Sequence, residues 1–128
     1  MAIFEGCSQG FWSTRLDAWG ATGFTTDTLF FDVFSRVVTD PDLTLLEAIN
    51  LTGPGVPVNV HQLTIQAVAA LLNAAHPDVN YPLTVAKVIE EFQEAFDTGD
   101  SEQINDQKDR FENFNADLIC PLPGTPSV

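Results

Sequence analysis

The stretch NVHQLTIQAVAALLNAAHP, residues 59–77, decides the fold of this chain. From Leu63 to Ala75 its apolar residues fall on nearly every side of a helix, so other elements must cover this helix on most sides. Asn59 is a residue type that caps helix starts, and Pro77 disfavours a helical conformation of the residue before it. We therefore predict a long helix here, ending near Ala75, at the centre of the fold.

Two amphipathic helices are predicted after this central segment. Thr84 caps the first helix, Gly99 ends it, and its apolar stripe is Val85, Val88, Ile89, Phe92 and Phe96. Asp100 or Ser101 starts the second helix, and its apolar face is Ile104, Phe111, Phe114 and Leu118. The first of these helices carries Glu90, Glu91 and Glu94 outside its apolar stripe.

Three shorter helices are predicted before the central segment. They span residues 8–19, where Gly20 and Gly23 follow, residues 26–37, which the Asp40-Pro41 pair terminates, and residues 43–51. Residues 52–57 carry two prolines and two glycines and read as a loop. No alternating run predicts a strand. The expected fold class is all-α, with five or six helices in an irregular or orthogonal bundle.

Length and composition indicate one globular domain. The chain has 128 residues, of which 45% are hydrophobic and 18% are charged, and single domains cluster at about 100–150 residues. We assign residues 1–120 to one helical domain. Residues 121–128 contain three prolines and are expected to form an extended tail with a mobile end.

The charge of the chain limits its partners. Eighteen acidic residues against five basic ones leave a net charge of −13, which repels phosphate backbones and anionic lipid headgroups. We therefore expect no nucleic-acid partner. No apolar run is long enough to span a membrane, so membrane insertion is not expected either.

Two cysteines lie near the ends of the chain, Cys7 and Cys120. Because the termini of compact domains are often close together, we predict a disulfide between them that encloses almost the whole fold. The alternative is two separate buried thiols in a reduced cytosol. Residues 1–6 lack the basic and apolar regions of a signal peptide. Either the protein is cytoplasmic, or a signal has been removed and Met1 was added for expression.

Aromatic residues are the first candidate for a binding surface. Trp12 and Trp19 are seven residues apart and so share a helix face, whereas the adjacent Phe30 and Phe31 cannot point the same way. Core packing is the favoured interpretation of these side chains. The alternative is a surface for self-association or for a ligand, formed by Trp12, Trp19, Phe30 and Phe31.

Acidic residues are the second candidate, as a weak metal site. Four of them crowd the predicted turn near Gly99, namely Asp97, Asp100, Glu102 and Asp106. Their spacing does not match a calcium-binding EF-hand loop, so a solvated acidic turn is favoured over a calcium site. The chain also lacks the Gly-x-Ser-x-Gly nucleophile motif, a phosphate-binding loop and a dinucleotide fingerprint. We expect no catalytic residues and no required cofactor.

Several motifs together resemble a known family. Residues 7–12 read CSQGFW, with a second tryptophan at Trp19; residues 71–77 read LLNAAHP, residues 79–84 read VNYPLT, and residues 120–122 read CPL. On these motifs nearly the whole chain resembles an uncharacterised domain of secreted bacterial proteins. The chain departs from that pattern at Ser13-Thr14-Arg15, where the family commonly has Lys-Asn-His. The resemblance implies export to an extracellular or cell-surface setting and supports the Cys7–Cys120 bridge, and it implies no particular activity.

The sequence ranks three classes of function. The leading hypothesis is a non-catalytic extracellular domain, a surface, matrix or filament component that contacts a protein partner or itself. The second is a module that binds a small molecule, a glycan or calcium through an aromatic pocket near Trp12 and Trp19. A hydrolase is third.

Overall fold

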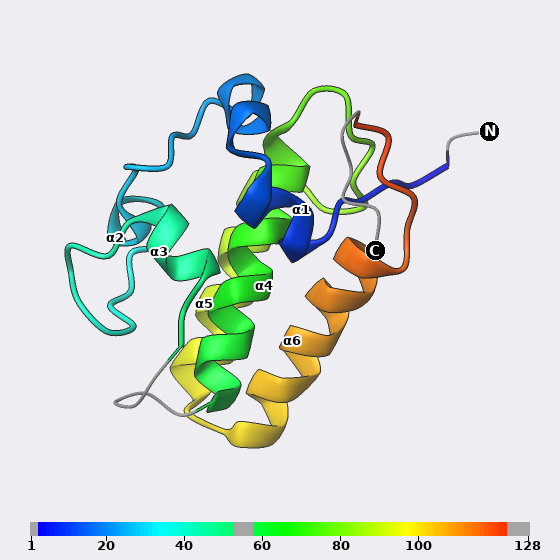
Figure 1. The fold of residues 1–128 in the computed structure, drawn as a ribbon. Coiled ribbons are helices and arrows are strands. Elements are labelled where there is room, and N and C mark those ends of the chain that lie inside the picture. Colours follow the sequence, from blue (N-terminus) through cyan, green and yellow to red (C-terminus); the bar gives the residue numbers. More distant parts are fainter. Residues whose placement is uncertain (1–2, 53–57, 123–128) are drawn as a thin grey trace.

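A computed structural model describes residues 3–52 and 58–122. Within these residues the chain forms helices (Figure 1), together with two isolated β-bridges. The elements are α1 (Gln9–Thr14), the 3-10 helix η1 (Leu16–Thr22), α2 (Phe30–Phe34), α3 (Leu45–Ile49), α4 (Val58–Ala75), α5 (Val85–Thr98) and α6 (Ser101–Ala116). The fold class is all-α, as predicted. The described residues hold seven helical segments, more than the five or six expected.

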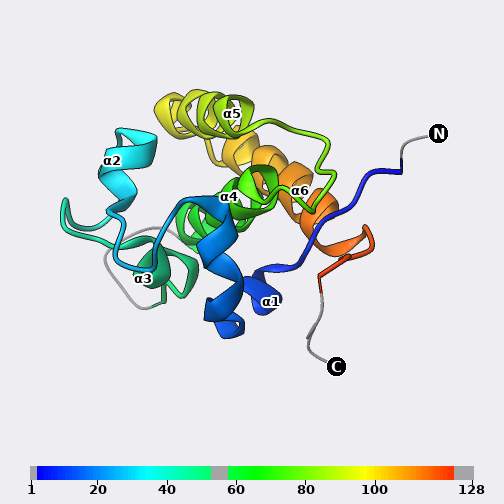
Figure 2. The same ribbon diagram turned by 90° about the horizontal axis from the view of Figure 1, so that it is seen from above.

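Helix α4 is the centre of the fold. It contacts α1, η1, α3, α5 and α6, and in the view from above these helices surround it (Figure 2). Every residue from Gln66 to Asn73 is buried. The prediction of a central helix is confirmed, with its start at Val58 rather than after Asn59.

Helix α5 begins and ends where the sequence predicts, and α6 begins as predicted but ends at Ala116, before Leu118 of its predicted apolar face. The Thr84 side chain accepts a hydrogen bond from the amide of Lys87, and Gly99 adopts a left-handed conformation with φ 64°. The Asp100 side chain caps α6 by accepting from the amide of Glu102. The apolar stripe of α5 packs inward through Val88, Phe92 and Ala95.

The first predicted helix is divided in two. Ser8 caps α1, and Arg15 then leaves the helical conformation with ψ 70° before η1 begins. The Trp12 carbonyl accepts a hydrogen bond from the Trp19 indole nitrogen at 2.9 Å. A continuous α-helix would instead pair that carbonyl with the amide of Leu16. The side-chain bond therefore accompanies the break, and Gly23 ends η1 with φ 84°.

Helices α2 and α3 are shorter than predicted. An antiparallel bridge joins Leu29 to Thr44, and the amide of Phe30 donates to the Leu43 carbonyl at 2.8 Å. Residues expected in the first turns of both helices are thus held in an extended pairing. Thr44 and Glu47 form a complete capping box at the start of α3, and Ser35 ends α2 with φ 55°.

The two ends of the chain meet at the disulfide. Cys7 and Cys120 are bonded, with their Cα atoms 4.5 Å apart, so the predicted bridge is present. A parallel bridge pairs Glu5 with Ile119 beside it. Leu122 is buried, so the packed part of the chain extends two residues into the predicted tail. Residues 53–57 of the predicted loop and residues 123–128 of the tail lie outside the described residues.

Candidate functional site

A buried amide, Asn73 of α4, holds the N-terminal segment of the chain. Its Oδ1 accepts from the backbone amide of Cys7 at 2.8 Å and from the Trp12 indole nitrogen at 3.1 Å. Its Nδ2 donates to the Cys7 carbonyl at 2.8 Å and to Oδ1 of Asn115 at 3.0 Å. All four hydrogen-bonding positions of this side chain are therefore used.

The second buried amide, Asn115 of α6, extends the network. Its Oδ1 also accepts from the Tyr81 hydroxyl at 2.6 Å, and its Nδ2 donates to the backbone carbonyl and to the side-chain oxygen of Gln66. Burial raises the pKa of the Tyr81 phenol well above its ordinary value. The phenol therefore stays a hydrogen-bond donor at all physiological pH values.

We call these residues the amide network: Gln66, Asn73, Tyr81 and Asn115, with the backbone of Cys7 and the indole of Trp12. A fully satisfied network in a low-dielectric interior specifies one arrangement of the elements it joins. It ties together α1, α4, α6 and the segment before α5 and leaves no free acid, base or nucleophile among its members. Sequence reasoning missed it, although a lone Asn73 inside an apolar run was a visible sign.

Three of the four aromatic candidates belong to the core. Trp12, Trp19 and Phe30 are buried, and the nitrogen atoms of both indoles donate to internal acceptors. Phe30 stacks on Phe34 with ring centroids 4.6 Å apart. Only Phe31 of the four is exposed. The four side chains therefore do not form one surface, and the aromatic pocket expected near Trp12 and Trp19 is filled by core packing.

The four acidic candidates do not converge on a metal site. Asp97 forms a bidentate ion pair with Arg36, with contacts of 2.8 and 2.7 Å, which holds the pKa of the Asp97 carboxyl below its ordinary value. Asp100 is the cap of α6, and Glu102 and Asp106 are exposed. No group of three histidine, cysteine or acidic side chains suited to a metal occurs in residues 3–52 and 58–122.

A surface depression of about 440 Å³ lies between α2 and α3, lined by Thr39, Asp40, Asp42, Leu43 and Glu47. The carboxylates of Asp40 and Glu47 accept hydrogen bonds from the nearby backbone amides of Asp42 and Thr44. These are the local bonds of a turn and of a helix cap. The lining offers no set of polar groups directed at one point.

The two histidines differ in their surroundings. His76 is buried beside Trp12, and its Nδ1 accepts from the amide of Asp78 at 3.1 Å, as expected for a residue that ends a helix. His61 in the first turn of α4 is also buried, and its Nε2 has no hydrogen-bond partner among the described residues. The first turn of α4 therefore faces protein rather than solvent at this position.

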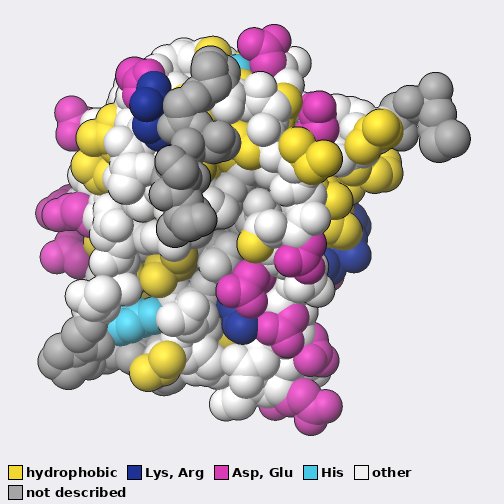
Figure 3. Space-filling model, turned by 45° about the vertical axis from the view of Figure 1, so that its right-hand side comes forward, with side chains coloured by type: hydrophobic (Ala, Val, Ile, Leu, Met, Phe, Trp, Pro, Cys, Tyr) yellow, Lys and Arg dark blue, Asp and Glu magenta, His cyan; other side chains and the backbone are white. Residues whose placement is uncertain are grey.

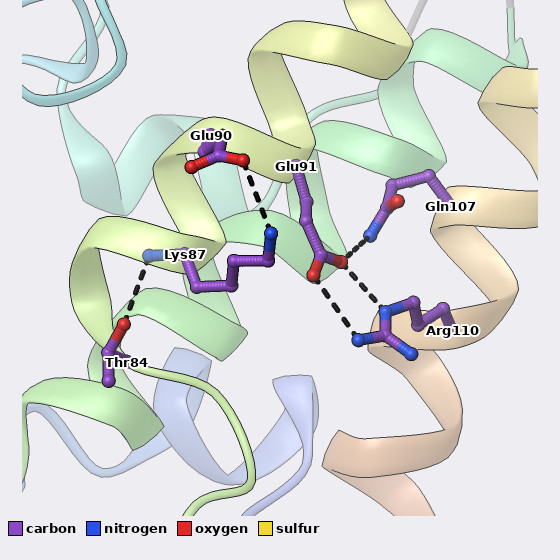
Figure 4. Close-up of polar contacts among 6 residues, drawn as sticks. All are labelled: Thr84, Lys87, Glu90, Glu91, Gln107 and Arg110. Carbon is purple, nitrogen blue, oxygen red and sulfur yellow. Dashed lines mark hydrogen bonds and ion pairs between the residues drawn. The ribbon is translucent and has the colours of Figure 1, made fainter.

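A charged cluster joins α5 to α6 (Figure 4). The Glu91 carboxylate accepts from Arg110 at 2.7 and 3.2 Å and from Gln107 at 2.8 Å. Burial acts to raise the pKa of Glu91, but the hydrogen bonds from Arg110 and Gln107 outweigh it and hold that pKa below its ordinary value. The Arg110 guanidinium also lies over the Phe114 ring at 5.1 Å.

Each of the five basic side chains is already paired with a carboxylate. The pairs are Arg15–Asp17, Arg36–Asp97, Lys87–Glu90, Lys108 with Asp109 and Glu112, and Arg110–Glu91. Most of the acidic side chains thus have no basic partner within the described part of the chain. The surface that remains is strongly negative.

Exposed apolar side chains gather where the two ends of the chain meet. Ile3, Phe4 and Ile119 are 72%, 54% and 76% exposed, and the Glu5–Ile119 bridge brings their segments together. We call these three residues the terminal apolar patch. In Figure 3 hydrophobic side chains cluster beside the N-terminal end of the chain. Sequence reasoning missed this patch because its two parts are more than 100 residues apart.

Comparisons of the chain with protein-family models, with curated proteins and with solved structures find no match. Among the described residues no helix has both the length and the apolar character needed to cross a membrane.

Proposed function

We propose that this chain is an exported, non-catalytic interaction domain that associates with further copies of itself through the terminal apolar patch. The observation that carries the proposal is the exposure of Ile3, Phe4 and Ile119 on segments held together by the disulfide. Large apolar side chains that gather on a surface are typical of contact sites. Export is supported by the disulfide, since such bonds persist in oxidising compartments.

A second copy is the partner that suits this patch. In the described part of the chain, the backbone of Ile119 forms one hydrogen bond, to the Gly6 amide, on one side of its segment. An extended segment with an open edge pairs readily with another extended segment. A second copy supplies such an edge together with the same apolar side chains. Because both copies carry a charge of −13, their repulsion opposes association, and salt that screens this charge promotes it.

Light scattering after size-exclusion chromatography tests self-association. We expect the particle mass to exceed one chain at high protein concentration and to rise further when sodium chloride is increased from about 0.02 to 0.5 M. The triple variant Ile3→Ser, Phe4→Ser, Ile119→Ser is expected to stay monomeric. A control variant, Phe31→Ser with Val58→Ser, removes exposed apolar side chains elsewhere and is expected to associate like the natural chain.

A natural chain that remains monomeric at every concentration and salt level would refute self-association. Equal association of the triple variant and the control variant would refute the patch as the contact. Export is tested separately by alkylating protein taken directly from its native cells. Blocked thiols are expected there, and two free thiols would contradict export.

A further inference from the structure

The two segments joined by the disulfide are anchored very differently. The N-terminal segment, residues 5–7, is held by its own contacts with the body of the domain. The amide of Glu5 donates to the Asn80 carbonyl at 2.8 Å, and the Glu5 carboxylate accepts from the Asn80 amide at 2.9 Å. Asn73 bonds both the amide and the carbonyl of Cys7. None of these bonds involves a residue after α6.

The C-terminal segment, residues 117–122, has fewer contacts. We call it the strap. One backbone hydrogen bond of 3.2 Å joins its Ile119 carbonyl to the Gly6 amide. The disulfide and the burial of Leu122 complete the described attachment beyond the end of α6. Leu118 is only partly buried and Ile119 is exposed, so among the described strap residues Leu122 is the main apolar side chain whose burial opposes the departure of the strap.

The two sulfur-bearing residues also differ in accessibility. Cys7 is fully buried, at 0% exposure, beneath the amide network, whereas Cys120 is partly exposed. Thiol–disulfide exchange begins with a thiolate that must reach one sulfur atom of the bond. Of the two residues only Cys120 has surface open to solvent, so we expect the attack at its sulfur atom.

We propose that the Cys7–Cys120 disulfide is a redox-sensitive clasp, whose opening by a small thiol releases the strap while the body of the domain stays folded. The thiolate attacks Sγ of Cys120 and forms a new S–S bond with it. The Cys7–Cys120 bond breaks, and its electron pair leaves on Sγ of Cys7, which takes a proton from water. A second small thiolate attacks the sulfur of the first, so that the two small molecules leave as a disulfide, and Sγ of Cys120 departs with the electron pair and takes a proton from water.

Release of the strap changes the terminal apolar patch. The departure of Ile119 takes one of its three residues away from the segment that carries the other two, and the Gly6 amide loses its acceptor. The segment from Glu5 to Cys7 keeps its bonds to Asn80 and Asn73. If the chain self-associates as proposed above, the oxidised form is the one that associates, and opening of the disulfide weakens the association.

Native-state thiol exchange, performed on dilute monomer, tests the clasp. Reduced glutathione is the probe, followed by alkylation, peptide mass spectrometry and amide hydrogen exchange. We expect the mixed disulfide on Cys120, a near-ultraviolet circular dichroism signal from the buried Trp12 and Trp19 that is retained, and exchange in residues 118–122 that is at least about tenfold faster. Exchange in α4 and at the Cys7 amide is expected to stay unchanged.

The double variant Cys7→Ser, Cys120→Ser provides the same open state without a reagent, and its exchange pattern is expected to match. Three results would overturn the proposal: a mixed disulfide on Cys7, loss of the tryptophan signal together with faster exchange throughout α4, or a strap that exchanges no faster once the bond is open. A disulfide that glutathione does not open in the folded protein would also overturn it. Because the protein is monomeric in this experiment, its outcome does not depend on whether self-association occurs.

Discussion

Helices α4, α5 and α6 run for 18, 14 and 16 residues, whereas η1, α2 and α3 run for seven, five and five. We call the long helices the body and residues 15–51 the short-helix region. An isolated helix of five residues is far below the length that is stable in water. The short helices must therefore derive their stability from contacts with the body.

Those contacts are specific: α3 and η1 pack on α4, and α2 packs on α5. Phe34 stacks against Phe30 and meets Phe92 with ring centroids 5.0 Å apart. Gln93 donates to the Phe34 carbonyl at 2.9 Å, and Arg36 pairs with Asp97. The body, by contrast, is tied together by the amide network in its interior. The long helices are therefore held together by contacts among themselves, whereas the short helices depend on contacts with the long ones.

The largest expected effect is the loss of the central amide. Asn73→Ala removes four hydrogen bonds and leaves buried donors and acceptors unpaired, so we expect a loss of about 4 kcal/mol in the free energy of unfolding. Within the described residues the side chain of the exposed Asn50 bonds the Leu46 carbonyl alone, and Asn50→Ala is expected to cost about 0.5 kcal/mol. Urea denaturation measures both values. Similar losses of unfolding free energy in the two variants would contradict the view that the body, and not the short-helix region, holds the stabilising polar network.

A pair of glycines provides the next comparison. A Cβ atom at Gly6 would overlap the backbone carbonyl oxygen of Phe114, whereas a Cβ at Gly20 would meet nothing within 4 Å. We expect Gly6→Ala to cost about 2 kcal/mol by forcing the N-terminal segment away from α6. Gly20→Ala is expected to be neutral or stabilising by up to about 0.5 kcal/mol. Thermal unfolding of both variants checks the pair, and an unaffected Gly6→Ala protein would show that the segment has room to move.

Two threonine residues cap a short helix and a long helix in the same way. Thr44 caps the five-residue α3 and Thr84 caps the 14-residue α5, each by accepting a hydrogen bond from a backbone amide. Substitution by alanine is expected to cost about 1 kcal/mol in each case. Hydrogen exchange is expected to differ: Thr44→Ala exposes all of α3, whereas Thr84→Ala affects only the first turn of α5. If α3 remains protected, its stability does not depend on its own cap.

The smallest expected effect concerns pH and the Glu91 cluster. Because the pKa of folded Glu91 lies below its ordinary value, its contribution to stability is complete above about pH 5 and is lost as the pH falls through the folded pKa. We expect this loss to be about 1 kcal/mol, since Arg110 is partly exposed. Arg110→Met should flatten this part of the pH–stability curve, measured by urea denaturation between about pH 3 and 6. An Arg110→Met curve as steep as that of the natural chain would assign the acid sensitivity to other carboxylates.

Prediction from the sequence succeeded where a feature depends on neighbours within one or two helical turns. The apolar spacing of α5 and the capping chemistry of Thr84, Gly99 and Asp100 are local properties, and the structure has them as predicted. The disulfide was predicted from the position of its cysteines near the two ends of a compact domain. The prediction was wrong for α2, because its expected first turn pairs with Thr44 instead.

The candidate site residues also depend on distant parts of the chain, and local sequence patterns therefore misplaced them. The aromatic candidates were chosen by spacing along one helix, yet Trp12 and Trp19 are buried because α4 covers that face. The acidic candidates near Gly99 are close in sequence, but Asp97 is directed to Arg36, 61 residues away. The terminal apolar patch combines Ile3 and Ile119, which lie on segments from opposite ends of the chain, and no local sequence pattern predicts that these segments meet.

The sequence by itself determined the all-α class, the central helix, the amphipathic pair that follows it and the negative charge of the surface. These properties depend on the period of the α-helix, on capping side chains and on composition, all of which act over a few residues. Only the tertiary structure decided where the first helix breaks, which aromatic residues are buried, how Asn73 and Asn115 satisfy each other, and which apolar side chains remain exposed. Several of those outcomes depend on partners far apart in the sequence, such as Asn73 and Asn115, which are 42 residues apart, and the two cysteines, which are 113 apart. A buried polar group or an apolar side chain is stabilised by whatever the folded chain brings against it.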